Sequence, residues 1–346
     1  MSDLAIVTGY PGWLGSRLVR YLREPHPDWP GDRPAPRFER VRCLVLPGTA
    51  PNGAQGLELV EGDVRDPGAV GRLFRDARGA TVFHLAGIIH PRRVRELYEV
   101  NAEGTRHLVA AAAAAGAGRL LATSSNSPAG VSRDPSERFD ERSPDRPWMA
   151  YGRSKQLMEE ALLGAHLAGA IEATVLRPCW FYGPGQPPRQ SVFFKMIRQG
   201  RAPIVGRGEA RRSMSYVDNT VLGLLLAAAT PAAAGQTYWL ADERPYSMEE
   251  IVGTVEELLE SEFGLPVAHD RMRLPSLASE VAVGVDAALQ AAGLYHQKIH
   301  VLGEMNKTIA CSIEKARAEL GYRPAVELRE GMRRSIMWCL EHGHDI

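Results

Sequence analysis

The sequence predicts an α/β protein with a Rossmann-type doubly wound parallel sheet and a smaller C-terminal substrate lobe. Three observations support this fold class. A β-branched apolar run at 4–8 leads into a glycine-rich turn and then an amphipathic helix. Up to residue 178, apolar strand segments alternate with helical segments, which is typical of parallel strands joined by right-handed crossovers. The alternation ends at the Pro- and Gly-rich stretch 181–190.

The elements are expected in a regular order. The predicted strands cover 4–8, 41–46, 57–66, 81–87, 119–125 and 171–178, and the helices after the first cover 67–78, 93–115 and 148–168. Proline-rich segments at 25–38 and 126–147 are expected to be loops. We therefore divide the chain into a dinucleotide-binding Rossmann domain at 1–178 and a part at 179–346 that is mainly a substrate-binding lobe, interleaved with the Rossmann core.

Composition excludes several classes of function. The 346 residues include 41 basic and 41 acidic side chains, so nothing favours nucleic acid or an anionic membrane as a partner. Met1 leads directly into the first strand and no apolar run reaches membrane-spanning length, so neither a signal peptide nor a membrane helix is expected. The four cysteines are widely spaced, which argues against a metal site or disulfides. These features predict a cytoplasmic protein that acts on a small molecule.

The first turn has the glycine spacing of a nucleotide-binding site. Gly9, Gly12 and Gly15 follow the first strand as G-x-x-G-x-x-G. Gly9 permits the tight turn, Gly12 lets a pyrophosphate approach the backbone, and Gly15 lets the helix pack close to the strand. The N–H groups at the start of that helix then face the phosphates.

A second stretch, YGRSK, carries acid/base chemistry. Tyr151 and Lys155 are four residues apart at the start of a predicted helix, so their side chains share one face. A nearby ammonium group is expected to lower the pKa of the phenol. The fifth strand ends in Ser124 and Ser125, at the sheet edge where open α/β folds bind ligands. A hydroxyl there can hold a substrate oxygen beside Tyr151.

These blocks together resemble the extended short-chain dehydrogenases/reductases, which are NAD-dependent epimerase/dehydratase-like enzymes. TGYPGWLG, GDVRD, FHLAG, VNAEGT, TSSNSPAG, YGRSK and LRPCWFYGPG follow one another in the family's order. The C-terminal part, including YVDN at 216–219, resembles the 3β-hydroxysteroid dehydrogenase branch. The resemblance implies a homodimer formed through the alanine-rich helix and the helix at 148–168.

The resemblance also assigns roles to individual residues. It makes Ser125 the catalytic serine, Tyr151 the acid/base, and Lys155 the residue that tunes Tyr151 and holds the nicotinamide ribose. The implied cofactor contacts are the three glycines, the backbone N–H groups of Trp13 and Leu14 at the pyrophosphate, Asp63 and Val64 at the adenine, Ala86 and Gly87 along the cofactor, and Pro178 beside the nicotinamide.

Departures from the family pattern bear on the substrate. Asn126 and Ser127 follow Ser125, where dehydratases carry an acidic residue, so no elimination of water is expected. Trp180 stands where nucleotide-sugar enzymes usually have an asparagine, whereas Arg212 matches their diphosphate-binding arginine or is simply a solvated cation. Ser125, Trp180 and Arg212 are the candidate substrate contacts.

Two functions remain open on this basis. The first is an oxidoreductase that interconverts a secondary alcohol and a ketone, and the second is a nucleotide-sugar epimerase with a transient 4-keto intermediate and tightly bound NAD. Leu46 occupies the position that selects between cofactors, and it matches neither the carboxylate of NAD-binding sites nor the arginine of NADP-binding sites. We expect NAD, with Arg37 or Arg40 as the residues that would fold back toward a 2′-phosphate.

Overall fold

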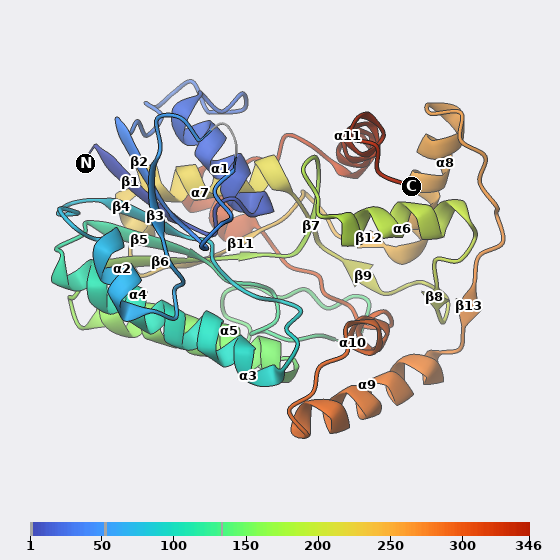
Figure 1. The fold of residues 1–346 in the computed structure, drawn as a ribbon. Helices are drawn as coiled ribbons and strands as arrows, with labels where there is room; N and C mark the ends of the chain where they lie inside the picture. The colour runs from blue at the N-terminus through green and yellow to red at the C-terminus, as the bar shows by residue number, and fades with distance from the viewer. Residues whose placement is uncertain (1–2, 52–53, 133) are drawn as a thin grey trace.

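A parallel sheet of seven strands organises the computed structural model, which describes residues 3–51, 54–132 and 134–346 (Figure 1). Its order is β11-β6-β5-β4-β1-β2-β3, and neighbouring strands are parallel throughout. The strand order reverses between β1 and β4, which creates the crevice where doubly wound folds bind ligands. The strands are β1 (Leu4–Thr8), β2 (Arg40–Val45), β3 (Glu58–Glu61), β4 (Thr81–His84), β5 (Arg119–Thr123), β6 (Glu172–Pro178) and β11 (Thr237–Leu240).

Helices cover both faces of this sheet (Figure 1). Helices α1 (Trp13–Arg23) and α7 (Val217–Ala229) lie on one face, and α2 (Pro67–Leu73), α4 (Gly104–Ala114) and α5 (Met149–Leu167) lie on the other. Because successive strand residues point to opposite faces, Ala5 and Val7 of β1 join the first core and Leu4 and Ile6 join the second. This arrangement confirms the predicted Rossmann-type fold class.

The structure differs from the sequence-based elements in three places. Strand β11 comes from the second half of the chain and adds a seventh strand beside β6, where six had been predicted. The helix expected over 93–115 is divided into α3 (Val94–Leu97), the π-helical segment η1 (Tyr98–Glu103) and α4. The predicted helix at 67–78 ends at Leu73.

Several of the remaining elements form a third core, beside the sheet. Helices α6 (Pro188–Arg198), α8 (Met248–Ser261) and α11 (Leu328–Glu341) pack there with β7 (Trp180–Tyr182) and β10 (Met214–Tyr216). Short ladders join β7 to β10, β9 (Arg211–Arg212) to β12 (Tyr246–Ser247), and β8 (Ile204–Val205) to β13 (Arg273–Leu274). The single turns η2 (Pro231–Ala233) and η3 (Ala316–Leu320) pack instead with α7 in the core that contains α1. The division of the chain at residue 178 stays a prediction.

Helices α9 (Ser276–Ala291) and α10 (Gln297–Glu304) pack against each other in a unit that we call the cap, residues 276–304. The cap lies close to the start of α5 and to α3 (Figure 1). The N–H of Val94 donates to the carbonyl of Gly293, and the N–H of Ala150 donates to Oε1 of Gln290. These bonds place the cap over the residue that immediately precedes Tyr151.

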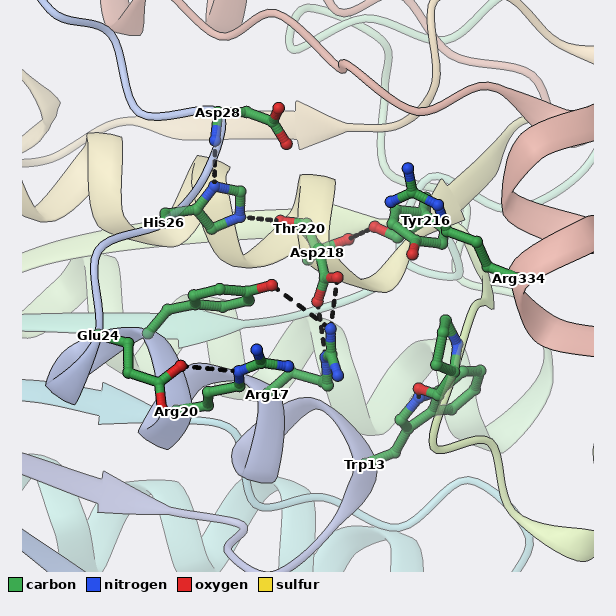
Figure 2. A network of polar contacts seen from close by, with 12 residues as sticks. Trp13, Arg17, Arg20, Glu24, His26, Asp28, Tyr216, Asp218, Thr220 and Arg334 are labelled. Atoms are coloured by element: carbon green, nitrogen blue, oxygen red, sulfur yellow. Dashed lines mark hydrogen bonds and ion pairs between the residues drawn. The ribbon is translucent and has the colours of Figure 1, made fainter. Parts of the chain in front are cut away.

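The YVDN segment fastens α7 to α1 (Figure 2). Arg17 of α1 donates from Nε and Nη2 to the two carboxylate oxygens of Asp218, at 2.7 and 2.5 Å. His26, from the loop after α1, is bonded to the carbonyl of Asp218. Asn219 donates to the carbonyl of Val326. These contacts give YVDN a structural role.

Of the helices in the described ranges, none has the length and hydropathy needed to span a bilayer.

Candidate active site

The glycine turn is built so closely that side chains are excluded from it. Gly9 has φ of 89°, and a Cβ there would lie 2.7 Å from the carbonyl carbon of Leu85. A Cβ on Gly15 would lie 2.4 Å from the carbonyl oxygen of Gly9, so only glycine lets α1 begin this near β1. Gly12 is the N-cap of α1, and among the described residues no side chain caps that end. The first N–H groups of α1, including those of Trp13 and Leu14, are thus available to an anion.

The side chain of Trp13 links this turn to the segment after β7. Its Nε1 donates to the carbonyl of Pro184 at 2.8 Å, and its ring lies 6.1 Å from that of Phe181. The side chain of Leu14 packs against the core shared by α1 and α7. Trp13 therefore fixes the LRPCWFYGPG block beside the glycine turn, as well as offering its backbone N–H.

Ser125, Tyr151 and Lys155 come together where β5 ends and α5 begins. All three side chains are buried. Burial raises the pKa of Tyr151 to about 12, a hydrogen bond with Ser125 acts against this, and the negative charge of Glu304 adds to it. The Ser125 hydroxyl thus influences the phenol, and it lies 3.3 Å from Oγ of Ser127 and 3.4 Å from Oδ1 of Asn126.

Lys155 lies beneath this pair. Its Nζ donates to the carbonyl of Thr123 at 3.0 Å. Burial lowers its pKa to about 8, although the negative charge of Glu159 acts in the opposite direction. Burial of the phenol outweighs the other influences on Tyr151, so its pKa is raised overall, and the expectation that Lys155 lowers the pKa of the phenol stays a prediction.

A chain of buried polar groups supports the site from below, and the sequence analysis did not identify it. Thr8 and Thr105 bond the two ring nitrogens of His84, at 2.7 and 2.8 Å, and Thr105 donates to the carbonyl of Asn101. The Asn101 side chain, within η1, donates to Ser154 at 3.0 Å. Burial, followed by the charge of Lys155, lowers the pKa of His84 to about 3, so its imidazole is neutral. His84 belongs to the FHLAG block, and Asn101 and Thr105 belong to the VNAEGT block, so these two motifs indicate the buried polar groups.

The residues expected along the cofactor form a shallow cradle. A Cβ on Gly87 would lie 3.2 Å from both Oδ1 of Asn101 and Nζ of Lys155, so a side chain there would fill the space beside the lysine. The N–H of Ala86 donates to the hydroxyl of Thr8. This cradle and the uncapped N-terminus of α1 fit a dinucleotide that extends from the pyrophosphate turn to Lys155.

At the expected adenine end, side chains are already paired. Asp63 accepts hydrogen bonds from the backbone and side chain of Arg65, and these bonds, the side-chain ones first, hold its pKa below the usual value. Val64 is buried against Gly104, where a Cβ would lie 2.7 Å from its Cγ2. Val64 therefore helps to set the spacing between this loop and α4.

The arginines considered for a 2′-phosphate lie at the wrong end of β2. Arg40 begins β2 and pairs with Glu58, with Nε 2.5 Å from Oε1. Leu46 directly follows the strand and is 52% exposed, so about 20 Å of extended chain separates the two residues. Arg37 precedes Arg40 in the chain. The suggestion that Arg40 folds back to a ribose at Leu46 is therefore wrong, and the suggestion for Arg37 stays a prediction.

The candidate substrate contacts lie along the other side of the crevice. Pro178 is buried at the end of β6, in register with Leu240 of β11. Trp180 lies on β7 with its ring 5.7 Å from that of Phe193. Arg212 is buried, and its Nη2 donates to the carbonyl of Glu304 at 2.5 Å. Its Nε has no hydrogen-bond partner among the described residues. Arg212 is thus not a solvated surface cation.

Comparison with known proteins decides the family. Residues 5–241 match the model of the NAD dependent epimerase/dehydratase family. The chain belongs to this family. The resemblance to extended short-chain dehydrogenases/reductases is thereby confirmed, and the protein is an NAD-dependent enzyme of the dehydrogenase, reductase or epimerase kind.

Two relatives and one solved structure illustrate the range of this family. The chain is 48% identical over 345 residues to the uncharacterized protein y4nL of Sinorhizobium fredii. The aligned region covers 99% of this chain and 96% of that protein. It is 28% identical over 356 residues to 2-alkyl-3-oxoalkanoate reductase of Stenotrophomonas maltophilia, covering 95% and 97%. DesIV, the dTDP-glucose 4,6-dehydratase from Streptomyces venezuelae, was solved with NAD and TYD bound. It shares the fold with a TM-score of 0.72 at 24% identity, covering 98% and 97%.

Proposed function

We propose that this protein interconverts a secondary alcohol and a ketone with a nicotinamide cofactor, with Tyr151 as the acid/base. The observation that carries the proposal is that Ser125, Tyr151 and Lys155 are buried together where β5 ends and α5 begins, with Lys155 close to Gly87 at the expected cofactor position. A nicotinamide bound along the cradle supplies the acceptor or donor of hydride. Every other part of the chemistry belongs to side chains of the site.

The residues divide this work as follows. The Ser125 hydroxyl donates to the substrate oxygen and holds it next to the Tyr151 phenol. In the direction of reduction, Tyr151 donates its proton to that oxygen, and in the direction of oxidation its phenolate accepts the proton. The Lys155 ammonium binds the nicotinamide ribose. Thr8, His84, Thr105 and Asn101 hold this arrangement without carrying charge themselves.

The structure favours NAD over NADP in this proposal. The exposed side chain of Leu46 gives a 2′-phosphate no cation to pair with, and Arg40 is held by Glu58 at the opposite end of β2. Burying an unpaired phosphate dianion is costly. Titration of the protein with NADH and NADPH, followed by quenching of tryptophan fluorescence, tests this, and tighter binding of NADPH by about tenfold would reject the preference.

The polar lining of the crevice favours a hydroxyl-rich or anionic substrate. Arg212 is buried with a free Nε, and Glu304 and His300 lie on the cap side of Tyr151. The buried guanidinium of Arg212 also supports the second candidate, a nucleotide-sugar epimerase, because a guanidinium can bind a diphosphate. The two functions differ in whether reduced cofactor accumulates.

A panel of secondary alcohols tests both candidates. Purified protein is incubated with NAD and dTDP-glucose, UDP-glucose, 3-hydroxyalkanoates or 3β-hydroxysteroids, while reduced cofactor and products are followed by absorbance and mass spectrometry. Tyr151→Phe is expected to reduce turnover by about a hundredfold or more with cofactor binding retained. Tyr238→Phe, on the edge strand β11, is the matched control. Near-normal turnover by Tyr151→Phe would reject the assignment.

We also propose that the protein is a homodimer that pairs through α4 and α5. Both helices lie on one outer face of the sheet (Figure 1). Light scattering coupled to gel filtration measures the oligomer directly, and a monomeric mass at all concentrations would reject the pairing.

A further inference from the structure

The cap brings a carboxylate to the catalytic tyrosine from a distant part of the chain. Glu304 is the last residue of α10, and its negative charge is one of the influences that raise the pKa of Tyr151. Its side chain is 23% exposed, so the carboxylate is accessible to water. Its backbone carbonyl is held by Arg212, which fixes the end of the helix independently of the side chain.

A connected set of side chains orients this carboxylate. Nε2 of His300 lies 3.5 Å from Oε1 of Glu304, and Nδ1 of His300 lies 2.7 Å from Oδ2 of Asp286. The same Asp286 oxygen accepts from Nε2 of Gln290, whose Oε1 accepts the N–H of Ala150. The set therefore begins next to Tyr151 in the chain and ends at Glu304, whose negative charge acts on the Tyr151 phenol.

The electrostatics of this set favour the protonated form of His300. Burial alone would lower the pKa of His300, but its hydrogen bond with Asp286 and the charges of Glu304 and Asp286 outweigh burial and raise it. The imidazole therefore lies 3.5 Å from the Glu304 carboxylate, a group of the kind that can accept a proton.

We propose that Glu304 is a second acid/base group of this active site, which removes and returns a proton at the carbon next to the carbonyl of a bound ketone. The proposal rests on the proposed function, since it needs a ketone held by Ser125 and Tyr151. Directly after Ser125, where dehydratases carry an acidic residue, this chain has Asn126 and Ser127. The cap supplies the group from α10.

The step balances without any co-reactant. The C–H bond next to the carbonyl breaks, its electron pair forms the C=C bond of an enolate, and the carbonyl π pair moves onto oxygen. The proton forms an O–H bond with the Glu304 carboxylate. The phenol of Tyr151 donates a hydrogen bond to the enolate oxygen. Reversal after exchange with water replaces that hydrogen by one from solvent, so neither oxidation nor reduction takes place.

Deuterium exchange isolates this step from hydride transfer. The probe is the ketone identified by the alcohol panel, or dihydroxyacetone, a small hydroxyl-rich ketone, if the panel yields none. It is incubated in D₂O with NAD-saturated protein, and deuterium at the carbon next to the carbonyl is measured by mass spectrometry. Wild-type protein is expected to exceed the buffer rate, and Glu304→Gln to lower the protein-dependent rate by about a hundredfold.

Controls separate a chemical role from a structural one. Glu304→Gln should keep the wild-type unfolding temperature and NADH affinity, because the backbone carbonyl that Arg212 binds is unchanged. Glu314→Gln, at an exposed carboxylate with 72% side-chain exposure, should exchange at the wild-type rate. His300→Gln retains Glu304 without its imidazole, and it should slow exchange to a smaller extent; it replaces Glu304→Gln as the test variant if the latter does not fold.

Wild-type exchange at the buffer rate, or unchanged exchange in the test variant, would overturn the proposal. The two proposals also fail in distinguishable ways. Absence of hydride transfer with every alcohol in the panel rejects the proposed function, whatever the exchange rate. Hydride transfer without protein-dependent exchange rejects only the role of Glu304.

Discussion

Lys155 is expected to reduce the stability of the fold while it serves the chemistry. Its ammonium is buried, and burial lowers its pKa from 10.5 to about 8. At about 1.4 kcal/mol per pKa unit, keeping this lysine charged in the folded protein costs about 3 kcal/mol at neutral pH. Replacement by Met removes that cost, and loss of the bond to the Thr123 carbonyl returns about 1 kcal/mol. Lys155→Met should therefore stabilise the protein by about 2 kcal/mol at pH 7 while abolishing turnover.

The pH dependence of the free energy of unfolding provides a further test of this prediction. Between pH 8 and 10.5 the unfolded chain binds a proton at Lys155 that the folded protein has released, so wild-type stability should rise through that window. The advantage of Lys155→Met should shrink in parallel, vanish at about pH 9.5, and become a deficit of about 1 kcal/mol above about pH 10.5. Urea unfolding of the cofactor-free protein, followed by circular dichroism, measures both curves. Lys298→Met, at an exposed position, should change stability by less than about 0.5 kcal/mol. A variant less stable than wild type at pH 7, or a difference independent of pH, would refute the reasoning.

Two further predictions concern the frame of the site. Arg177 pairs inside the protein with Glu159, with Nε 2.9 Å from Oε1, so Arg177→Met should destabilise it by about 3–5 kcal/mol in urea unfolding because a carboxylate is left buried and unpaired. A loss below about 1 kcal/mol, as for a surface pair, would contradict this. Gly15→Ala should weaken NADH binding by about tenfold or more in a fluorescence titration, because the new Cβ would meet the Gly9 carbonyl at 2.4 Å. Gly71→Ala, where a Cβ meets nothing within 4 Å, should leave NADH affinity unchanged.

Local patterns were sufficient to predict several elements in the first half of the chain. The strand at Leu4–Thr8 and the turn after it were predictable because β-branched residues and spaced glycines determine the backbone locally. The same holds for Tyr151 and Lys155, which one helix places on one face.

Long-range packing set the limit of prediction. The run Thr237–Leu240 reads as any short apolar strand, and only its pairing with β6 makes it part of the central sheet. Glu304 is far from Tyr151 in the chain, so no spacing rule connects the two. The pKa of Tyr151 depends on how deeply the fold buries the phenol, which a helical spacing does not reveal.

The second half of the chain supplies β11 and α7 to the central sheet, and this has a consequence for folding during biosynthesis. Every residue of α7 from Val217 to Ala228 is buried, and this helix covers a face of the sheet made by strands synthesised much earlier. A nascent chain that has emerged only to residue 178 leaves that face uncovered, along with the open edge of β6 that β11 later occupies. Strands and apolar surface in this state invite aggregation. The Rossmann half therefore completes its folding only after residue 240 has left the ribosome, and chaperone dependence should be greatest in that interval.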